Sequence, residues 1–171
     1  MFTAYFLQEA LIKELKKLFE EQRFPDRTGE MTEINVFEQF LPILDVEDGG
    51  ETQENLEGGL FGNVEEKMPA PYIQVILTGG KTSTVNQPSV VNVLLYMCIY
   101  DEGKLRNGYQ YILNMIQKIL ERFQKDSMLD GYRCDKEIQW EIGDTDDHPF
   151  YFGAMAMDFE VAMIGKESDY C

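Results

Sequence analysis

The chain has 171 residues, of which 44% are hydrophobic, so it is long enough to bury one core of ordinary size. It carries 15 basic and 31 acidic residues, which gives a net charge of −16 at pH 7. Binding to duplex DNA or to anionic lipid requires a basic surface, so this charge argues against both. The sequence has no run of 18 apolar residues and no basic start of a signal peptide, so no membrane segment is expected.

The three cysteines, Cys98, Cys134 and Cys171, are widely spaced and form no CxxC pair. This spacing indicates no disulfide framework and fits a reducing cytoplasm. We therefore expect the thiols to be chemically inert.

The N-terminal part of the chain predicts a helix followed by a possible strand. From Thr3 to Gln22 apolar residues recur at spacings of three and four, and Thr3 is a suitable N-cap. The helix is expected to end before Pro25, because the residue before a proline avoids helical backbone angles. Residues 34–40 form either a strand or an extended arm. The apolar face of the helix is expected to consist of Phe6, Leu7, Ala10, Leu11, Leu15, Leu18 and Phe19.

The composition changes sharply at Asp45. The stretch from Asp45 to Glu66 holds eight acidic residues and five glycines, with no lysine or arginine. Its apolar content is too low to offset the cost of ordering it, so we expect a flexible insertion at about residues 45–68. Leu60 and Phe61 could dock onto a neighbouring subunit. The alternative is a weak calcium site, although Leu56 occupies the position of the last ligand in an EF-hand loop.

The second half of the chain predicts two strands, a helix and two further strands. The apolar segment 72–77 and the β-branched run 90–99 indicate neighbouring antiparallel strands, the second of them buried on both faces. Apolar residues at spacings of three and four from Tyr109 to Phe123 predict an amphipathic helix. Residues 133–142 and 150–164 alternate between apolar and polar positions, as strands do. The inward positions of the last strand are expected to be Met155, Met157, Phe159, Val161 and Met163.

This order of elements predicts an α+β fold. We expect one domain spanning residues 1–171, with a mostly antiparallel sheet of four to five strands and two helices packed on one face. The order is helix, possible strand, insertion, two strands, helix, two strands.

The sequence shows no convincing catalytic motif. The tripeptide at 80–82, GKT, ends like a phosphate-binding loop, but Val75 stands where the loop needs its first glycine. The acidic turn before the last strand contains Asp144, Asp146, Asp147 and His148. Ordinary turn chemistry explains such a turn, and the chain has only one histidine, so a second imidazole for a metal site is missing. We therefore expect no enzymatic activity, no cofactor and no metal. A metal-using enzyme built on this turn is the weakest alternative.

The closing strands resemble those of a group of tailed-phage proteins. The segments that carry the resemblance are Trp140-Glu141-Ile142, the acidic turn, and the run from His148 to Met155. Earlier matches lie at 71–75, at 91–100 and at 107–119. In this order the segments resemble the tail terminator (tail completion, minor tail) proteins of siphophages and their prophage relatives. The resemblance covers roughly residues 70–164 and leaves the acidic insertion outside.

The resemblance implies a subunit of a homo-oligomeric ring, usually a hexamer. Such a ring caps the head-proximal end of the tail tube, stops its polymerisation and joins it to the head–tail connector. The implied partners are copies of the chain, the tail tube protein and the connector protein, without sequence-specific nucleic-acid binding or a membrane. The implied location is the head–tail joint of the virion, and the host cytoplasm during assembly. The expected contact residues are Leu60, Phe61, Phe150, Tyr151 and Phe152.

Two competing functions remain open at this point. The charge of −16 also suits an acidic DNA mimic that inhibits a basic DNA-binding protein, provided that its carboxylates are spaced like phosphates on one face. A neighbouring head–tail connector subunit is the other alternative. In the tail terminator interpretation, the acidic surface could line a lumen through which DNA slides without binding.

Overall fold

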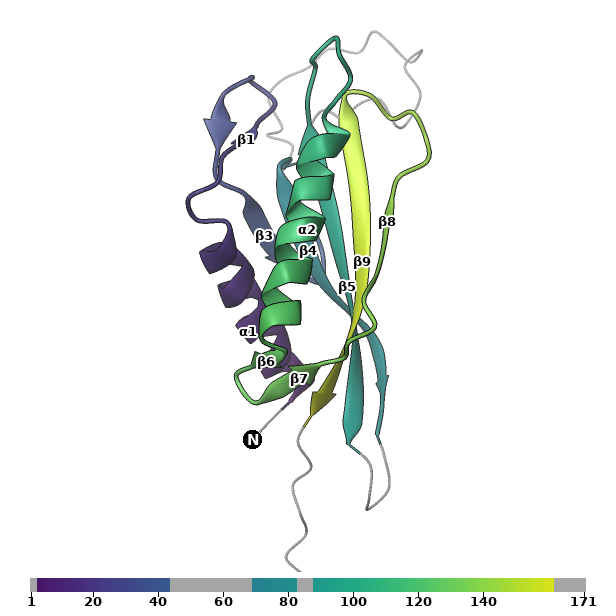
Figure 1. The fold of residues 1–171 in the computed structure, drawn as a ribbon. Coiled ribbons are helices and arrows are strands. Elements are labelled where there is room, and N and C mark those ends of the chain that lie inside the picture. The colour runs from purple at the N-terminus through teal and green to yellow at the C-terminus, as the bar shows by residue number, and fades with distance from the viewer. Residues whose placement is uncertain (1–2, 44–68, 83–87, 162–171) are drawn as a thin grey trace, which may run out of the picture.

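The computed structural model describes residues 3–43, 69–82 and 88–161. In these residues two helices lie over one side of a long, twisted sheet (Figure 1). The elements, in chain order, are α1 (Ala4–Leu18), β1 (Phe24–Pro25), β2 (Met31–Thr32), β3 (Asn35–Glu38), β4 (Tyr72–Lys81), β5 (Ser89–Tyr100), α2 (Tyr109–Lys125), β6 (Met128–Leu129), β7 (Tyr132–Cys134), β8 (Gln139–Ile142) and β9 (Phe150–Val161).

The main sheet has seven strands in the order β3-β4-β5-β9-β7-β6, and β8 also pairs with β9. The long strands β4, β5 and β9 form its centre and pair antiparallel. The outer edge of β9 is shared, because β7 pairs near its C-terminal end and β8 pairs along its middle. At the other edge β3 runs parallel to β4. The short strands β1 and β2 form a separate antiparallel pair.

The expectation of a mostly antiparallel sheet of four to five strands with two helices packed on one face is wrong, because the sheet differs in size and in strand direction. The chain is α+β with two helices, but its main sheet is mixed and has seven strands, and a second two-stranded sheet is present. A parallel neighbour requires a connection of a dozen residues or more, and residues 39–71 between β3 and β4 supply it. The segment 133–142 is also two strands rather than one. Asp135 interrupts it, because its carboxylate accepts the backbone N–H of Lys136 at 2.6 Å.

Helix α1 begins where the sequence predicts and ends earlier. The side chain of Thr3 accepts the backbone N–H of Phe6 at 3.3 Å, as an N-cap does. The helix ends at Leu18 rather than at Gln22. Phe6, expected on the buried face, is 48% exposed, and Gln8 is buried instead.

Gln8 is buried, and its side-chain amide hydrogen-bonds to two acceptors at the edge of the sheet. Its Nε2 donates to the backbone carbonyl of Val75 at 2.8 Å and to Oε1 of Gln39 at 3.2 Å. Gln39 Oε1 also accepts the backbone N–H of Leu77 at 3.0 Å. Side-chain amides thus continue the hydrogen bonding of β4 beyond the last residue of β3, where the backbone N–H of Leu77 would otherwise lose its partner.

Helix α2 covers the middle of the sheet, as the sequence predicts. It begins at Tyr109 after Gly108 and contacts β5, β8 and β9. Its buried residues are Ile112, Met115, Ile116, Ile119 and Phe123. Gly153 of β9 lies so close to the side chain of Ile112 that an added Cβ would overlap it. The two helices are joined by an ion pair between Glu14 and Arg122, each about one-fifth exposed.

One hydrophobic core fills the space between the helices and the sheet. Four of the predicted inward residues of β9 are buried there, namely Met155, Met157, Phe159 and Val161, whereas Met163 lies outside the described residues. Four residues on the helix-facing side of β5 are buried, namely Val93, Leu95, Met97 and Ile99, and Val91 on the same side is half-buried. On the other face of β5 only Cys98 is buried, so the central strand is less enclosed than the sequence suggests. Neither helix in the described part of the chain combines the length and apolarity that a bilayer crossing requires.

Candidate assembly surfaces

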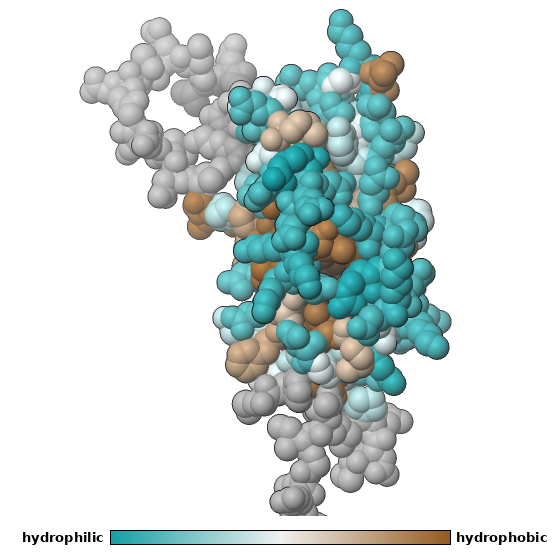
Figure 2. Space-filling model, turned by 60° about the vertical axis from the view of Figure 1, so that its left-hand side comes forward, coloured by the Kyte–Doolittle hydropathy of each residue, from teal (hydrophilic) through white to brown (hydrophobic). Residues whose placement is uncertain are grey.

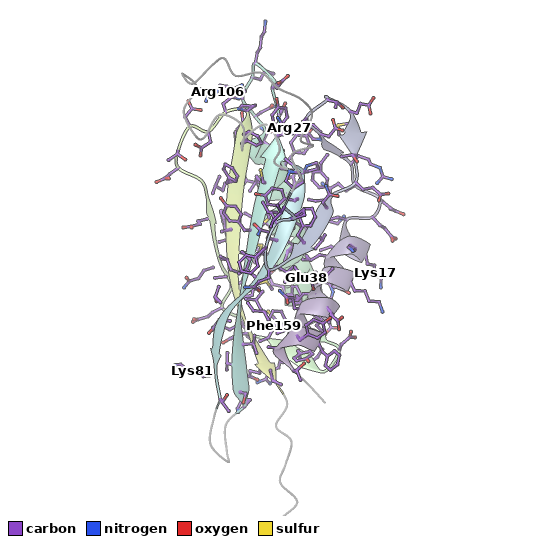
Figure 3. The ribbon with its side chains drawn as sticks, turned by 180° about the vertical axis from the view of Figure 1, so that it is seen from behind. Lys17, Arg27, Glu38, Lys81, Arg106 and Phe159 are labelled. Carbon is purple, nitrogen blue, oxygen red and sulfur yellow. The ribbon has the colours of Figure 1, made fainter. Side chains whose placement is uncertain are left out.

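The face of the sheet turned away from the helices carries a group of aromatic rings. Figure 3 shows the molecule from this side, with Arg106 near one end and Lys81 near the other. We call this surface the open face, and its rings are those of Phe37, Tyr72, Tyr96, Tyr100, Phe150 and Phe152. They come from β3, β4, β5 and β9, because alternate residues of neighbouring strands point to the same side.

The rings of the open face contact one another. Tyr96 stacks on Phe152 with ring centroids 5.8 Å apart, and Phe150 lies 6.3 Å from Phe152. Tyr100 meets Phe150 edge to face at 5.2 Å. Aromatic pairs in these geometries stabilise beyond the area that they bury. Among the described residues this cluster is made by the strands and by Ala70 and Leu41, and no helix contributes to it.

The predicted contact residues divide between two places. Phe150 and Phe152 lie on the open face, whereas Tyr151 points to the opposite side of β9 and packs against the core beside the helices. Three consecutive residues of a strand cannot share a face, so only two of them can act together. Leu60 and Phe61 lie outside the described residues.

A cavity of about 430 Å³ lies at the turn between β8 and β9. It is lined by the turn residues 142–148, by Arg106 and Tyr109, and by Phe150, Tyr151 and Phe152. Arg106 forms an ion pair with Asp146 at this cavity. Both side chains are at least half exposed, so the pair contributes little to stability.

The side chains of the acidic turn make short-range hydrogen bonds. His148 Nδ1 lies 3.3 Å from the hydroxyl of Tyr151, and the hydroxyl of Thr145 is bonded to Asp147 rather than to the histidine. In the described ranges no three histidine, cysteine or acidic side chains come together as metal ligands would. The cavity therefore combines carboxylates with aromatic rings, which is a lining suited to basic or apolar groups of a partner.

A smaller depression of about 220 Å³ lies on the open face, where β5, β9 and β8 run side by side. Ala154 and Ala156 of β9 form its floor, between Leu94 of β5 and the side chains of β8. Gln139 and Glu141 of β8 border it, whereas Trp140 between them, 49% exposed, points to the helix side of the sheet. The sequence places Trp140 on a strand but gives no sign that this strand is at an edge, so its exposure is a finding of the structure.

The two described thiols are buried and poorly ionisable. Burial raises the pKa of Cys98 to about 12, and a hydrogen bond with Tyr72 opposes part of that shift. Burial also raises the pKa of Cys134 to about 12, and the nearby carboxylates of Asp135 and Asp158 raise it further. Because the thiolate is the reactive form, neither cysteine is suited to nucleophilic chemistry.

We expect a Cys171→Ser variant to resist thiol labelling in the native state. With both remaining pKa values near 12, labelling at about pH 8 should be on the order of a thousandfold slower than for an exposed cysteine. A chromogenic disulfide reagent should report two thiols only after denaturation, and the wild type serves as the control for Cys171. Rapid native labelling of the variant would show that these thiols reach solvent.

Comparisons with known proteins add no relative to this description. A scan against protein-family models finds no match for the chain, and a search of curated proteins finds none either.

Proposed function

We propose that the chain is a structural virion protein that forms a ring and caps the head-proximal end of a phage tail tube. The observation that best supports this proposal is the open face, where aromatic rings lie opposite the helix-covered side of the sheet. Tyr96 and Phe152 are only half buried there. Aromatic residues supply much of the binding energy at protein interfaces, so such a face suits contact with another protein.

The charge distribution agrees with an assembly role. Helix α1 has a net charge of +1 and helix α2 a net charge of +2, whereas the chain as a whole carries −16. Negative charge is therefore concentrated outside the helices. Figure 2 shows the side on which α1 lies, where hydrophilic side chains cover most of the surface. A ring that turns its acidic surfaces toward its bore would repel DNA passing through it.

The DNA-mimic alternative finds less support on the open face. The carboxylates described there are those of Glu141, Asp158 and Glu160. Asp158 accepts a hydrogen bond from Asn92 at 2.6 Å, and Glu160 pairs with Arg133. A phosphate-like row needs several free charges at regular spacing, and two of these three carboxylates already have partners.

The proposal is tested with the tail tube protein of the same phage or prophage. Added during polymerisation, the wild-type chain should shorten the tubes and appear as a ring at one end in negative-stain electron microscopy. The double variant Tyr96→Ser, Phe152→Ser should lose this capping while keeping its circular dichroism spectrum, because it removes one stacked pair from the open face.

The matched control is the double variant Tyr5→Ser, Phe6→Ser. It removes another aromatic pair with centroids 5.8 Å apart, but from an exposed position on α1. This variant should cap tubes as the wild type does. Tubes of unchanged length in the presence of the wild type would overturn the proposal. Unchanged tubes together with binding to the connector protein would identify a connector subunit instead.

A further inference from the structure

Among the strands of the main sheet that have only one partner strand in the described residues, β3 and β8 lie on opposite sides of the sheet, and β6 is the third (Figure 1). Within the described part of the chain, β3 has no strand on the side away from β4, and β8 has none on the side away from β9. Each of these strands has four residues. An exposed strand edge presents unpaired backbone groups and pairs with another strand unless it is protected.

The backbone hydrogen bonds indicate which residues present these groups. The N–H groups of Asn35 and Gln39 donate to β4 or the residue before it, so the N–H and C=O groups of Val36 point away from β4. The N–H group of Gly143 donates to Phe152 of β9, and by the same alternation those of Trp140 and Ile142 point outward from β8.

The directions of the strands suit a contact between copies. Strand β3 is parallel to β4, and each further step through β5 and β9 to β8 is antiparallel. Strands β3 and β8 therefore run in opposite directions. When a second copy is related to the first by a rotation about an axis along the strands, its β3 lies antiparallel beside the first copy's β8.

The two edges also carry complementary shapes. Trp140 lies beside the free edge of β8 and is 49% exposed, on the same side of the sheet as its buried neighbour Met155. Beside the free edge of β3 lies a groove of about 570 Å³, between that strand and α1. The apolar wall of this groove on the helix side consists of Ile12 and Val36, and Phe37, whose ring lies on the open face, adjoins it. An indole ring on one edge thus matches an apolar groove on the other.

Charge complementarity favours a second copy as the occupant. The rim of the groove carries Lys13 and Lys16, together with Glu9 and Glu38. Neither lysine makes an ion pair within the described residues. Just before β8, Glu137 is also without an ion pair in those ranges, whereas Glu141 points to the open face, away from the helices. A lysine of the rim can therefore pair with Glu137 of the neighbouring copy when the edges meet.

We propose that β8 of one copy pairs with β3 of the next, with Trp140 inserted into the groove between α1 and β3. The contact uses two different surfaces, so each copy offers one of each kind to its neighbours. Repeated contacts of this type close into a ring or continue as an open helix. The choice of a second copy as occupant rests on the proposed function. The contact leaves the open face available to the tail tube.

The test uses two variants that each remove one side of the contact. Trp140→Glu removes the inserted ring, and Ile12→Trp fills the groove with an indole of its own. Light scattering over a dilution series should show the 19.8 kDa monomer for each variant alone and larger species for the wild type. Mixed together, the two variants should form a dimer and nothing larger, because one intact edge remains on each chain.

Two further variants exclude indirect effects. Leu105→Glu also replaces an exposed apolar residue, 87% exposed and outside both edges, with glutamate, and it should assemble as the wild type does. If Ile12→Trp fails to fold, Glu38→Pro serves in its place, because proline at an edge removes an outward N–H group. Assembly by Trp140→Glu, a mixture that stays monomeric, or a wild type that is monomeric at every dilution would each overturn the contact.

The outcomes for the contact and for the proposed function are separable. A Trp140→Glu variant that still forms rings and caps tubes would overturn the contact and leave the proposed function intact. Assembly through the two edges without any effect on tube length would support the contact and overturn the proposed function.

Discussion

The Phe159→Ala variant is expected to lose about 3–5 kcal/mol of unfolding free energy. Phe159 is fully buried near the C-terminal end of β9, and its ring meets that of Phe123 from α2 edge to face at 5.7 Å. Truncation removes the buried ring and leaves a cavity at the contact between helix and sheet. Denaturation by urea, followed by circular dichroism, gives the free energy from the midpoint and slope.

The matched control is Phe40→Ala, because it makes the same chemical change at a position that is 79% exposed. It should change the unfolding free energy by no more than about 0.5 kcal/mol. Similar losses in the two variants would mean that the ring of Phe159 does not pack against α2.

The Gly153→Val variant is expected to lose about 1–3 kcal/mol of unfolding free energy through overpacking. Gly153 lies on β9 where α2 approaches most closely, and a Cβ at this position would overlap the Ile112 side chain. Ile112 is fully buried, so the helix must shift to accept a larger residue. The thermal midpoint and the urea midpoint should both fall.

Ala156→Val is the control on the same strand. Ala156 is exposed on the open face, and valine is favoured in strands, so the unfolding free energy should change by about 0.5 kcal/mol or less. A Gly153→Val variant as stable as the wild type would show that α2 can move away from the sheet at little cost.

The helices could be predicted because their apolar residues recur with the helical period. Helix α2 buries Ile112, Ile116 and Ile119 from the predicted stripe, and its bounds agree with the pattern. In α1 the same rule failed at Phe6 and Gln8. A periodic stripe reports hydrophobicity, and it contains no information about the groups that hydrogen-bond to the side-chain amide of Gln8.

The pairing of the sheet could not be predicted in full, because register and neighbours depend on contacts between distant residues. The antiparallel pair β4–β5 was expected from its short connection and is confirmed. The parallel pairing of β3 with β4 has no local signal in the segment 34–40. The division of 133–142 into β7 and β8 depends on the carboxylate of Asp135, which the alternating pattern conceals.

The surfaces were the least predictable part of the molecule. The sequence predicts that the three successive aromatic residues 150–152 act as contact residues. The strand directs Tyr151 away from the other two. Tyr96 and Tyr100 join Phe150 and Phe152 only through the pairing of β5 with β9. The signal that could have found them is the recurrence of aromatic residues at alternate positions in two strands that pair.

The stability of the pairing between β3 and β4 depends only weakly on the length of the chain that connects them. The entropy of closing a connection grows only with the logarithm of its length, so doubling residues 39–71 would cost about 0.6 kcal/mol. Evolution can therefore lengthen, shorten or replace the acidic stretch within this connection without altering the strands that flank it. In an assembly, a change in the length of this connection can bring it into contact with a different partner while the fold stays the same.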